Sequence, residues 1–192
     1  MEALFVSTGV VALAEIGDKT QLLAFILAAR FKKPLPIIAG ILCATIVNHG
    51  LAGALGAWIT SAVNPEILRW VLGASFIGMA IWTMIPDKIE EEETQVAKKF
   101  GMFGATLVTF FLAEMGDKTQ IATVALAVHY SNPLLVVIGT TLGMLLADIP
   151  AVFVGDKLAN KLPMKLVHSI AAGVFTLLGV ATLLGAGAKF GF

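Results

Sequence analysis

The sequence contains one polar heptapeptide twice, each time within an apolar stretch long enough to cross a bilayer. It reads Glu-Ile-Gly-Asp-Lys-Thr-Gln from Glu15 and Glu-Met-Gly-Asp-Lys-Thr-Gln from Glu114. A charged side chain at the centre of a membrane-spanning helix costs about 2.5–3.5 kcal/mol, and each copy carries three such groups. Ionisable residues at membrane depth usually mark a substrate or ion pathway. The repeated heptapeptide therefore predicts such a pathway.

Oxygen atoms dominate the chemistry that the heptapeptide offers. On a regular helix, its glutamate, aspartate and glutamine share one face, so two facing copies would gather four carboxylates and two amide oxygens. Such donors suit a hard cation such as Mn²⁺, Ca²⁺ or Mg²⁺, whereas zinc or copper would be expected to recruit cysteine or histidine. The predicted metal ligands are Glu15, Asp18, Gln21, Glu114, Asp117 and Gln120.

Further polar groups accompany these ligands. Lys19 could pair with Glu15 one helical turn away, or occupy the site as a tethered cation when the metal leaves. The motif threonines could reach the ion only if the helices are interrupted, and otherwise they bond back to the preceding turn. Asn48 is better suited to an interhelical hydrogen bond than to ligation, and Asp148 is a candidate pathway or proton group. The possible auxiliary groups are Lys19, Lys118, Thr20, Thr119, Asn48, His49 and Asp148.

The composition places these motifs in an integral membrane protein. The chain has 192 residues, of which 58% are hydrophobic and only 14% charged, and its mean hydropathy is +0.91. A soluble domain would carry much more charge. Because the formal net charge is zero, a nucleic-acid partner, which needs a basic face, is not expected. The lone Cys43 is read as a packing residue, and no prosthetic cofactor is expected.

Six apolar segments of about the length needed to cross a bilayer follow one another along the chain. The fold predicted is therefore all-α, with six transmembrane helices. These segments are Leu4–Ala29, Leu35–Thr60, Ile67–Ile85, Gly104–Val128, Pro133–Val154 and Leu166–Ala188.

The six segments divide into two related halves. Residues 1–85 form the first three-helix repeat, 86–100 a charged linker with four consecutive glutamates (Glu90–Glu93), and 101–192 the second repeat. The halves match at an offset of 99 residues, which pairs Glu15 with Glu114 and His49 with Asp148. Since each half has an odd number of spans, the second should enter the membrane from the opposite side. This predicts an inverted repeat with a site near the bilayer midplane.

The basic residues predict the orientation. Nine lysines and arginines fall in the loops on one side of the membrane, and only Arg69 and Lys189 on the other. The positive-inside rule places the nine in the cytoplasm, and hence the linker in the cytoplasm and both termini outside it.

The complete motifs Glu15-Ile-Gly-Asp-Lys-Thr20 and Glu114-Met-Gly-Asp-Lys-Thr119 resemble the signature of a family of cation/proton exchangers for manganese and calcium. This family includes the Golgi manganese transporters of eukaryotes and bacterial manganese exporters of the MneA type. The resemblance extends over the whole chain. It implies that the motif acids bind the transported metal, that Mn²⁺ leaves the cytosol in exchange for protons, and that the protein lies in a bacterial inner (plasma) membrane. It leaves Ca²⁺/H⁺ exchange as an alternative.

Two other classes of function were weighed. An intramembrane aspartyl protease could use Asp18 and Asp117 as its catalytic pair, but it would need neither the glutamate nor the lysine that accompanies each aspartate. An exporter of organic cations or amino acids would usually line its site with aromatic or apolar groups, and only Phe25 lies near the motifs. The sequence therefore favours a secondary transporter that exports a hard divalent cation, with Mn²⁺ the favoured substrate and protons the counter-substrate.

Overall fold

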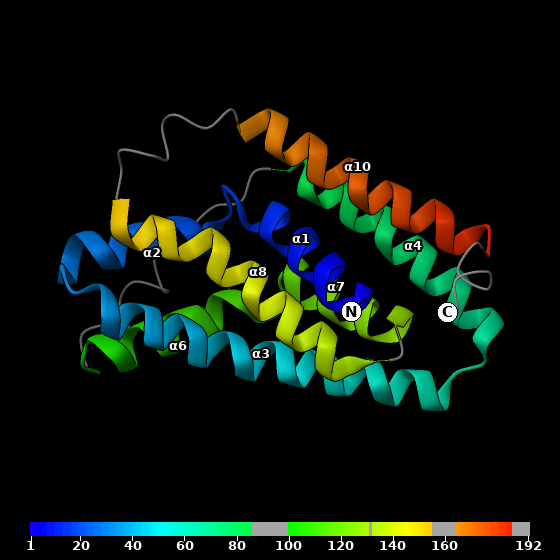
Figure 1. Cartoon of the computed structure of the whole chain (residues 1–192), viewed down its shortest axis with the longest axis horizontal. Coiled ribbons are helices and arrows are strands. Elements are labelled where there is room, and N and C mark those ends of the chain that lie inside the picture. Colours follow the sequence, from blue (N-terminus) through cyan, green and yellow to red (C-terminus); the bar gives the residue numbers. More distant parts are fainter. Residues whose placement is uncertain (86–99, 131, 155–163, 186–192) are drawn as a thin grey trace.

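A computed structural model describes residues 1–85, 100–130, 132–154 and 164–185, and in these residues all regular secondary structure is α-helical (Figure 1). The linker with its Glu90–Glu93 run, the predicted loop Asp156–Pro163 and the last residues of the predicted sixth span lie outside the described residues. The first half contains α1 (Glu2–Glu15), α2 (Lys19–Phe31), α3 (Pro34–Ala62) and α4 (Pro65–Thr83). The second half contains α6 (Met102–Glu114), α7 (Lys118–Tyr130), α8 (Pro133–Val154) and α10 (Met164–Leu183).

Local sequence explains where several helices begin and end. Three of them (α3, α4 and α8) start at a proline, which has no N–H to lose and a backbone angle suited to the first turn. Asn64 caps α4 because its side chain accepts a hydrogen bond from the backbone N–H of Glu66 at 2.9 Å. At the other end of a helix, Lys32 takes a left-handed conformation (φ 52°) and terminates α2.

The sequence left open whether the helices of the predicted spans Leu4–Ala29 and Gly104–Val128 are interrupted at the motifs, and the structure shows that both are. Each of these segments consists of two shorter helices, and the chain leaves helical geometry in the middle of the heptapeptide, between Glu15 and Lys19 and between Glu114 and Lys118. Among the described residues, three helices are long and apolar enough to cross a membrane: Pro34–Ala62, Pro133–Phe153 and Lys165–Leu183. The structure is thus that of an all-helical membrane protein.

The two halves pack against each other through equivalent contacts. Gly40 of α3 lies where an added Cβ would be 3.0 Å from the carbonyl oxygen of Phe103 and 2.7 Å from the Cβ of Thr106, both in α6. The equivalent contact in the other half, at an offset of 99 residues, is made by Gly139 of α8. A Cβ added to Gly139 would lie 2.6 Å from the carbonyl oxygen of Leu4 and 2.9 Å from the Cβ of Ser7, both in α1. Glycine at both positions allows the helix backbones to approach closely, as is common between membrane helices.

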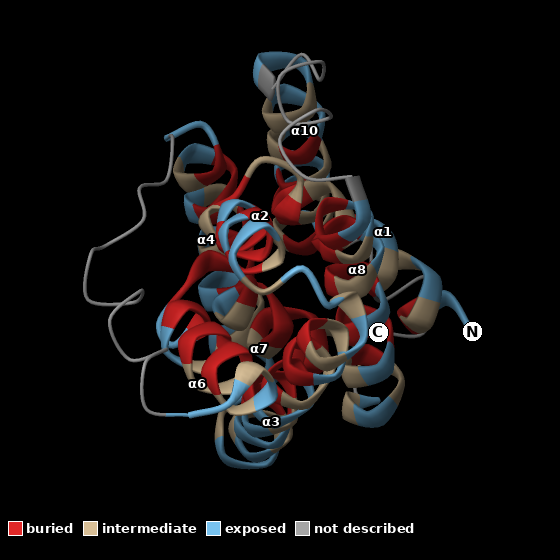
Figure 2. Ribbon diagram, turned by 90° about the vertical axis from the view of Figure 1, so that its left-hand side faces the viewer, coloured by how far each residue is buried: buried red, intermediate tan, exposed pale blue. Residues whose placement is uncertain are grey.

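The buried apolar residues form two clusters, and the two clusters are built largely from different helices. One joins α1, α4, α7, α10 and the first turn of α8 around Phe76, Leu126 and Phe175. The other joins α2, α3, α6 and α8 around Leu23, Ile41 and Phe110, and it includes no residue of α4 or α10. Figure 2 shows buried residues facing the middle of the molecule from each helix, with exposed residues outside. The α4–α10 pair, which lies side by side in Figure 1, therefore packs onto α1 and α7.

Candidate metal site

The two helix breaks have the same backbone geometry. Glu15 and Glu114 are the last residues of α1 and α6, and each is followed by an extended residue and then a glycine. Gly17 and Gly116 have φ angles of 86° and 77°, in the left-handed region that glycine adopts without the steric penalty of a Cβ. The glycines therefore allow one helix to end and the next to begin after only three non-helical residues.

The aspartate and glutamine of each motif close the break. The Asp18 side chain accepts a hydrogen bond from the N–H of Lys19 at 2.7 Å and caps the start of α2, where the partial positive charge of the helix N-terminus also favours a carboxylate. The amide oxygens of Gln21 and Gln120 accept hydrogen bonds from the N–H groups of Gly17 and Gly116, both at 2.9 Å. The structure thus directs the glutamine oxygens at the broken backbone.

The motif lysines form ion pairs between the halves. Lys118 Nζ lies 3.0 Å from Asp18 Oδ1, and Lys19 Nζ lies 3.4 Å from Asp117 Oδ1. The two pairs are equivalent at the 99-residue offset, so they tie each break to the other. They differ in burial: Lys118 is 1% exposed and Lys19 is 18% exposed. Pairing across the halves could not be foreseen from the position of a lysine within its own helix.

Three acids come together at the centre of the protein. Glu15, Glu114 and Asp117 each offer one carboxylate oxygen, and these oxygens lie within 4.8 Å of one another. Two ligands on opposite sides of a cation at about 2.3–2.6 Å are separated by about this distance. All three side chains are buried. The cluster therefore has the spacing and the hard oxygen donors of a divalent-cation site.

The two glutamates of this cluster have different surroundings. Thr20 donates a hydrogen bond to Glu15 Oε2 at 2.6 Å, and Thr119 of the other half donates to Glu15 Oε1. Neither carboxylate oxygen of Glu114 has a hydrogen-bond partner among the described residues. The charged groups that act most strongly on Glu114 are all acidic, namely Glu15, Asp117, Asp18 and Asp148. Such a buried, unbonded acid is very costly as a free anion and is suited to holding a cation.

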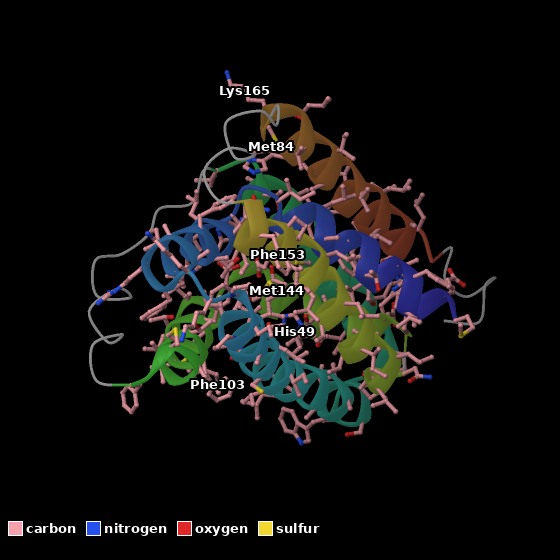
Figure 3. The ribbon with its side chains drawn as sticks, turned by 60° about the vertical axis from the view of Figure 1, so that its left-hand side comes forward. His49, Met84, Phe103, Met144, Phe153 and Lys165 are labelled. Carbon is pink, nitrogen blue, oxygen red and sulfur yellow. The ribbon has the colours of Figure 1, made fainter. Side chains whose placement is uncertain are left out.

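The remaining candidate residues lie on α3 and α8. The Asn48 side chain donates to the carbonyl oxygen of Phe111 in α6 at 3.1 Å, which is an interhelical bond. His49 and Asp148 are fully buried, and within the described part of the chain none of their polar side-chain atoms has a hydrogen-bond partner. Asp148 acts electrostatically on Glu114 and is itself acted on by Glu15. Figure 3 shows His49 of α3 and the buried Met144 of α8 in the central part of the molecule.

A signal in the sequence could have located the breaks. Gly-Asp directly before a helical segment is a stop-and-start pattern, because glycine ends a helix and aspartate is a preferred N-cap. Here Gly17-Asp18 and Gly116-Asp117 occupy these positions. The apolar residues on either side are equally compatible with one unbroken helix, so the sequence left the break open.

These features define a class of protein: a helical membrane transporter for cations, whose buried acids lie between two halves of the chain, and which is not an enzyme. The model of the family "Divalent cation/proton antiporter GDT1" matches residues 3–91 and again residues 102–189. The chain belongs to this family, as its motifs suggested, and the protease alternative is excluded.

Individual relatives resemble most of the chain. A Vibrio cholerae protein named "Putative manganese exporter" is 50% identical over 183 residues, which cover 95% of this chain and 90% of that protein. GDT1-like protein 3 of Oryza sativa subsp. indica is 30% identical over 91% of this chain and 71% of its own. GDT1-like protein 5 of Arabidopsis thaliana is 28% identical, covering 90% of this chain and 91% of its own. No solved structure shows a significant match to the chain.

Proposed function

We propose that this protein exports Mn²⁺ from the cytoplasm in exchange for protons, with Glu15, Glu114 and Asp117 as the metal-binding residues. The observation that carries the proposal is the convergence of three buried carboxylates from both motifs within 4.8 Å. The identity of 50% with the Vibrio cholerae protein, over nearly the whole of both chains, supports manganese as the cargo.

The size of the cluster favours Mn²⁺ over Ca²⁺. Calcium usually takes six to eight oxygen ligands, often with carboxylates bound through both oxygens. The amide oxygens of Gln21 and Gln120 are directed at backbone N–H groups and the threonine hydroxyls at Glu15, so the three clustered carboxylates are the ligands that the structure brings together. A small set of carboxylates suits the smaller Mn²⁺ ion, for which carboxylates are preferred ligands.

The charge of the buried groups supports proton exchange. Five buried acids (Glu15, Asp18, Glu114, Asp117 and Asp148) surround the site, together with the two motif lysines. If all were ionised, three negative charges would be uncompensated in a buried region. Because closely spaced like charges cannot all remain ionised, acids of this group must take up protons when the metal leaves. Metal and protons therefore compete for the same oxygens.

An inverted repeat would explain the equivalent contacts between the halves. Each glycine contact and each lysine–aspartate bridge has an equivalent in which the two halves have exchanged roles. Such an exchange is expected for two units around a two-fold axis. With both termini outside the cytoplasm, α1 and α7 would form the outer half of the protein and α2 and α6 the cytoplasmic half. The acid cluster would then lie near the midplane, where inverted-repeat transporters bind their substrates.

In this arrangement the structure would correspond to a state that is closed toward the outside. The α4–α10 pair packs on the outer helices α1 and α7 and shares one apolar cluster with them, whereas the cytoplasmic helices belong to the other cluster. In the opposite state, each half would make the contacts that its counterpart makes here. Helix α10 would then pack on α2, and α4 on α6. The equivalent metal cluster would then use Asp18 in place of Asp117, so all four motif acids would serve during one cycle.

Metal and proton fluxes in sealed proteoliposomes test the proposed function. With the membrane voltage clamped by an ionophore, Mn²⁺ movement measured together with internal pH should be accompanied by proton movement in the opposite direction. A pH gradient alone should drive Mn²⁺ across the membrane, and Ca²⁺ and Mg²⁺ should be transported more slowly at equal concentration. Mn²⁺ flux without any change of internal pH would show that the protein is not an exchanger.

Cross-linking tests the proposed conformational cycle. The ring of Phe76 in α4 lies 6.1 Å from that of His129 in α7, and the equivalent pair at the 99-residue offset is Phe175 with Arg30. In a Cys43→Ser background, a short bifunctional thiol reagent should join cysteines at 76 and 129 readily in metal-free protein and stop transport. Cysteines at 175 and 30 should be joined only during transport. Equal reactivity of both pairs without metal would contradict the two-state assignment.

A further inference from the structure

The hydroxyl groups of the two motif threonines are distributed unequally between two equivalent glutamates. The backbone breaks and the lysine–aspartate pairs obey the relation between the halves, but both hydroxyls donate to Glu15 and leave Glu114 without a hydrogen bond among the described residues. Glu15 accepts one bond from its own half and one from the other. This asymmetry lies at the metal site itself.

Donor counting explains why both glutamates cannot be held at once. Each threonine hydroxyl has one proton to donate, so two threonines supply two bonds, and Glu15 receives one at each of its two oxygens. The side chains involved are fully buried, and within the described part of the chain no other group donates a hydrogen bond to Glu114. In this state, one glutamate ligand is therefore oriented by hydroxyl groups, and its oxygens keep lone pairs for a cation, whereas the other is oriented by no hydroxyl group.

We propose that Thr20 and Thr119 are positioning residues that hold one motif glutamate at a time in its metal-binding orientation and leave the other to be oriented by the cation alone. This inference rests on the proposed function. Thr119 couples the two halves, because it lies in the first turn of α7, after the second break, and bonds Glu15, which ends α1 before the first break. In the opposite state of the transporter, both hydroxyls would bond Glu114, and Glu15 would be oriented by the cation alone.

Helix breaks are what allow this role. On an unbroken helix, the threonine five residues after a glutamate lies on a different face from it. The left-handed conformation of Gly17, within the first break, changes the direction of the chain. Thr20, at the start of the next helix, can therefore reach back to Glu15. Thr119 lies in the first turn of α7 in the same way and reaches Glu15 from the other half of the chain. The threonines thus act on the carboxylate and only through it on the metal.

The decisive variant is Thr119→Val, which keeps the shape of the side chain and removes the donor. Mn²⁺ binding to purified protein in detergent should weaken by about 10- to 100-fold, the factor expected when a metal ligand loses the hydrogen-bonding partner that orients it. Thr119→Ser, which restores a hydroxyl, should bind within about threefold of the wild type. The matched control is Thr123→Val, because Thr123 is equally buried in the same helix and its hydroxyl bonds only the carbonyl oxygen of Thr119.

A double-mutant cycle separates positioning from direct ligation. In the Glu15→Gln background, Thr119→Val should change Mn²⁺ binding at millimolar metal by less than about twofold, whereas in the Glu114→Gln background the full loss should persist. An equal effect in both backgrounds would show that Thr119 binds the metal itself and would overturn the proposal. So would wild-type affinity in Thr119→Val, or a serine variant as weak as the valine variant. Absence of Mn²⁺ binding by the wild type would instead refute the proposed function.

Discussion

Replacing Glu114 with glutamine should abolish Mn²⁺ transport while leaving the protein at least as stable as the wild type. Glu114 contributes one of the three clustered carboxylates and is the one whose oxygens have no hydrogen-bond partner among the described residues. Removing one partner of a buried charged interaction costs about 3–5 kcal/mol, which corresponds to a loss of at least about 100-fold. In the metal-free protein, the same change removes a buried like charge, so the folded state should not suffer.

Initial Mn²⁺ uptake and the melting temperature in detergent, measured on the same preparation, check this expectation. Glu66→Gln is the matched control, because Glu66 is exposed at the start of α4 and lies outside the cluster. It should transport like the wild type. Glu15→Gln and Asp117→Asn should also stop transport. If Glu114→Gln transports at a normal rate, the shared metal site is wrong. If it melts well below the wild type, Glu114 has a structural role.

Replacing Lys118 with methionine should destabilise the protein strongly. Its ammonium group pairs with Asp18 at 3.0 Å, and both side chains are almost completely buried. Methionine keeps much of the apolar stem but leaves Asp18 without this counter-ion, and breaking a buried pair from one side costs about 3–5 kcal/mol. The melting temperature in detergent should fall accordingly, and Asp18→Asn in the same chain should recover most of the loss because it removes the second charge.

Lys19→Met provides the internal comparison for this prediction. Lys19 forms the equivalent pair with Asp117, but the distance is 3.4 Å and the lysine is 18% exposed. Water can therefore compensate part of the lost interaction, and exposed pairs contribute much less to stability. The fall in melting temperature should be clearly smaller than for Lys118→Met. Equal effects of the two substitutions would show that the two ion pairs do not differ in solvation.

Several properties of this protein could be predicted from its sequence because they depend on composition and on local pattern. The apolar segments required helices in a membrane, since backbone polar groups find no partners in lipid. The repeated acids predicted a cation pathway, since charged residues are too costly at that depth to be kept without a use. The offset of 99 residues indicated two halves, and the family model matches both of them.

Other properties were decided only by the tertiary structure. Regular helical periodicity would have placed the motif glutamines beside the acids and the threonines away from them. The breaks at Gly17 and Gly116 instead turn the glutamines to the backbone and bring the threonines to Glu15. The partners of the lysines lie in the other half. Residues about 100 positions apart meet only after both halves have packed together, so no local pattern in the sequence could specify these contacts.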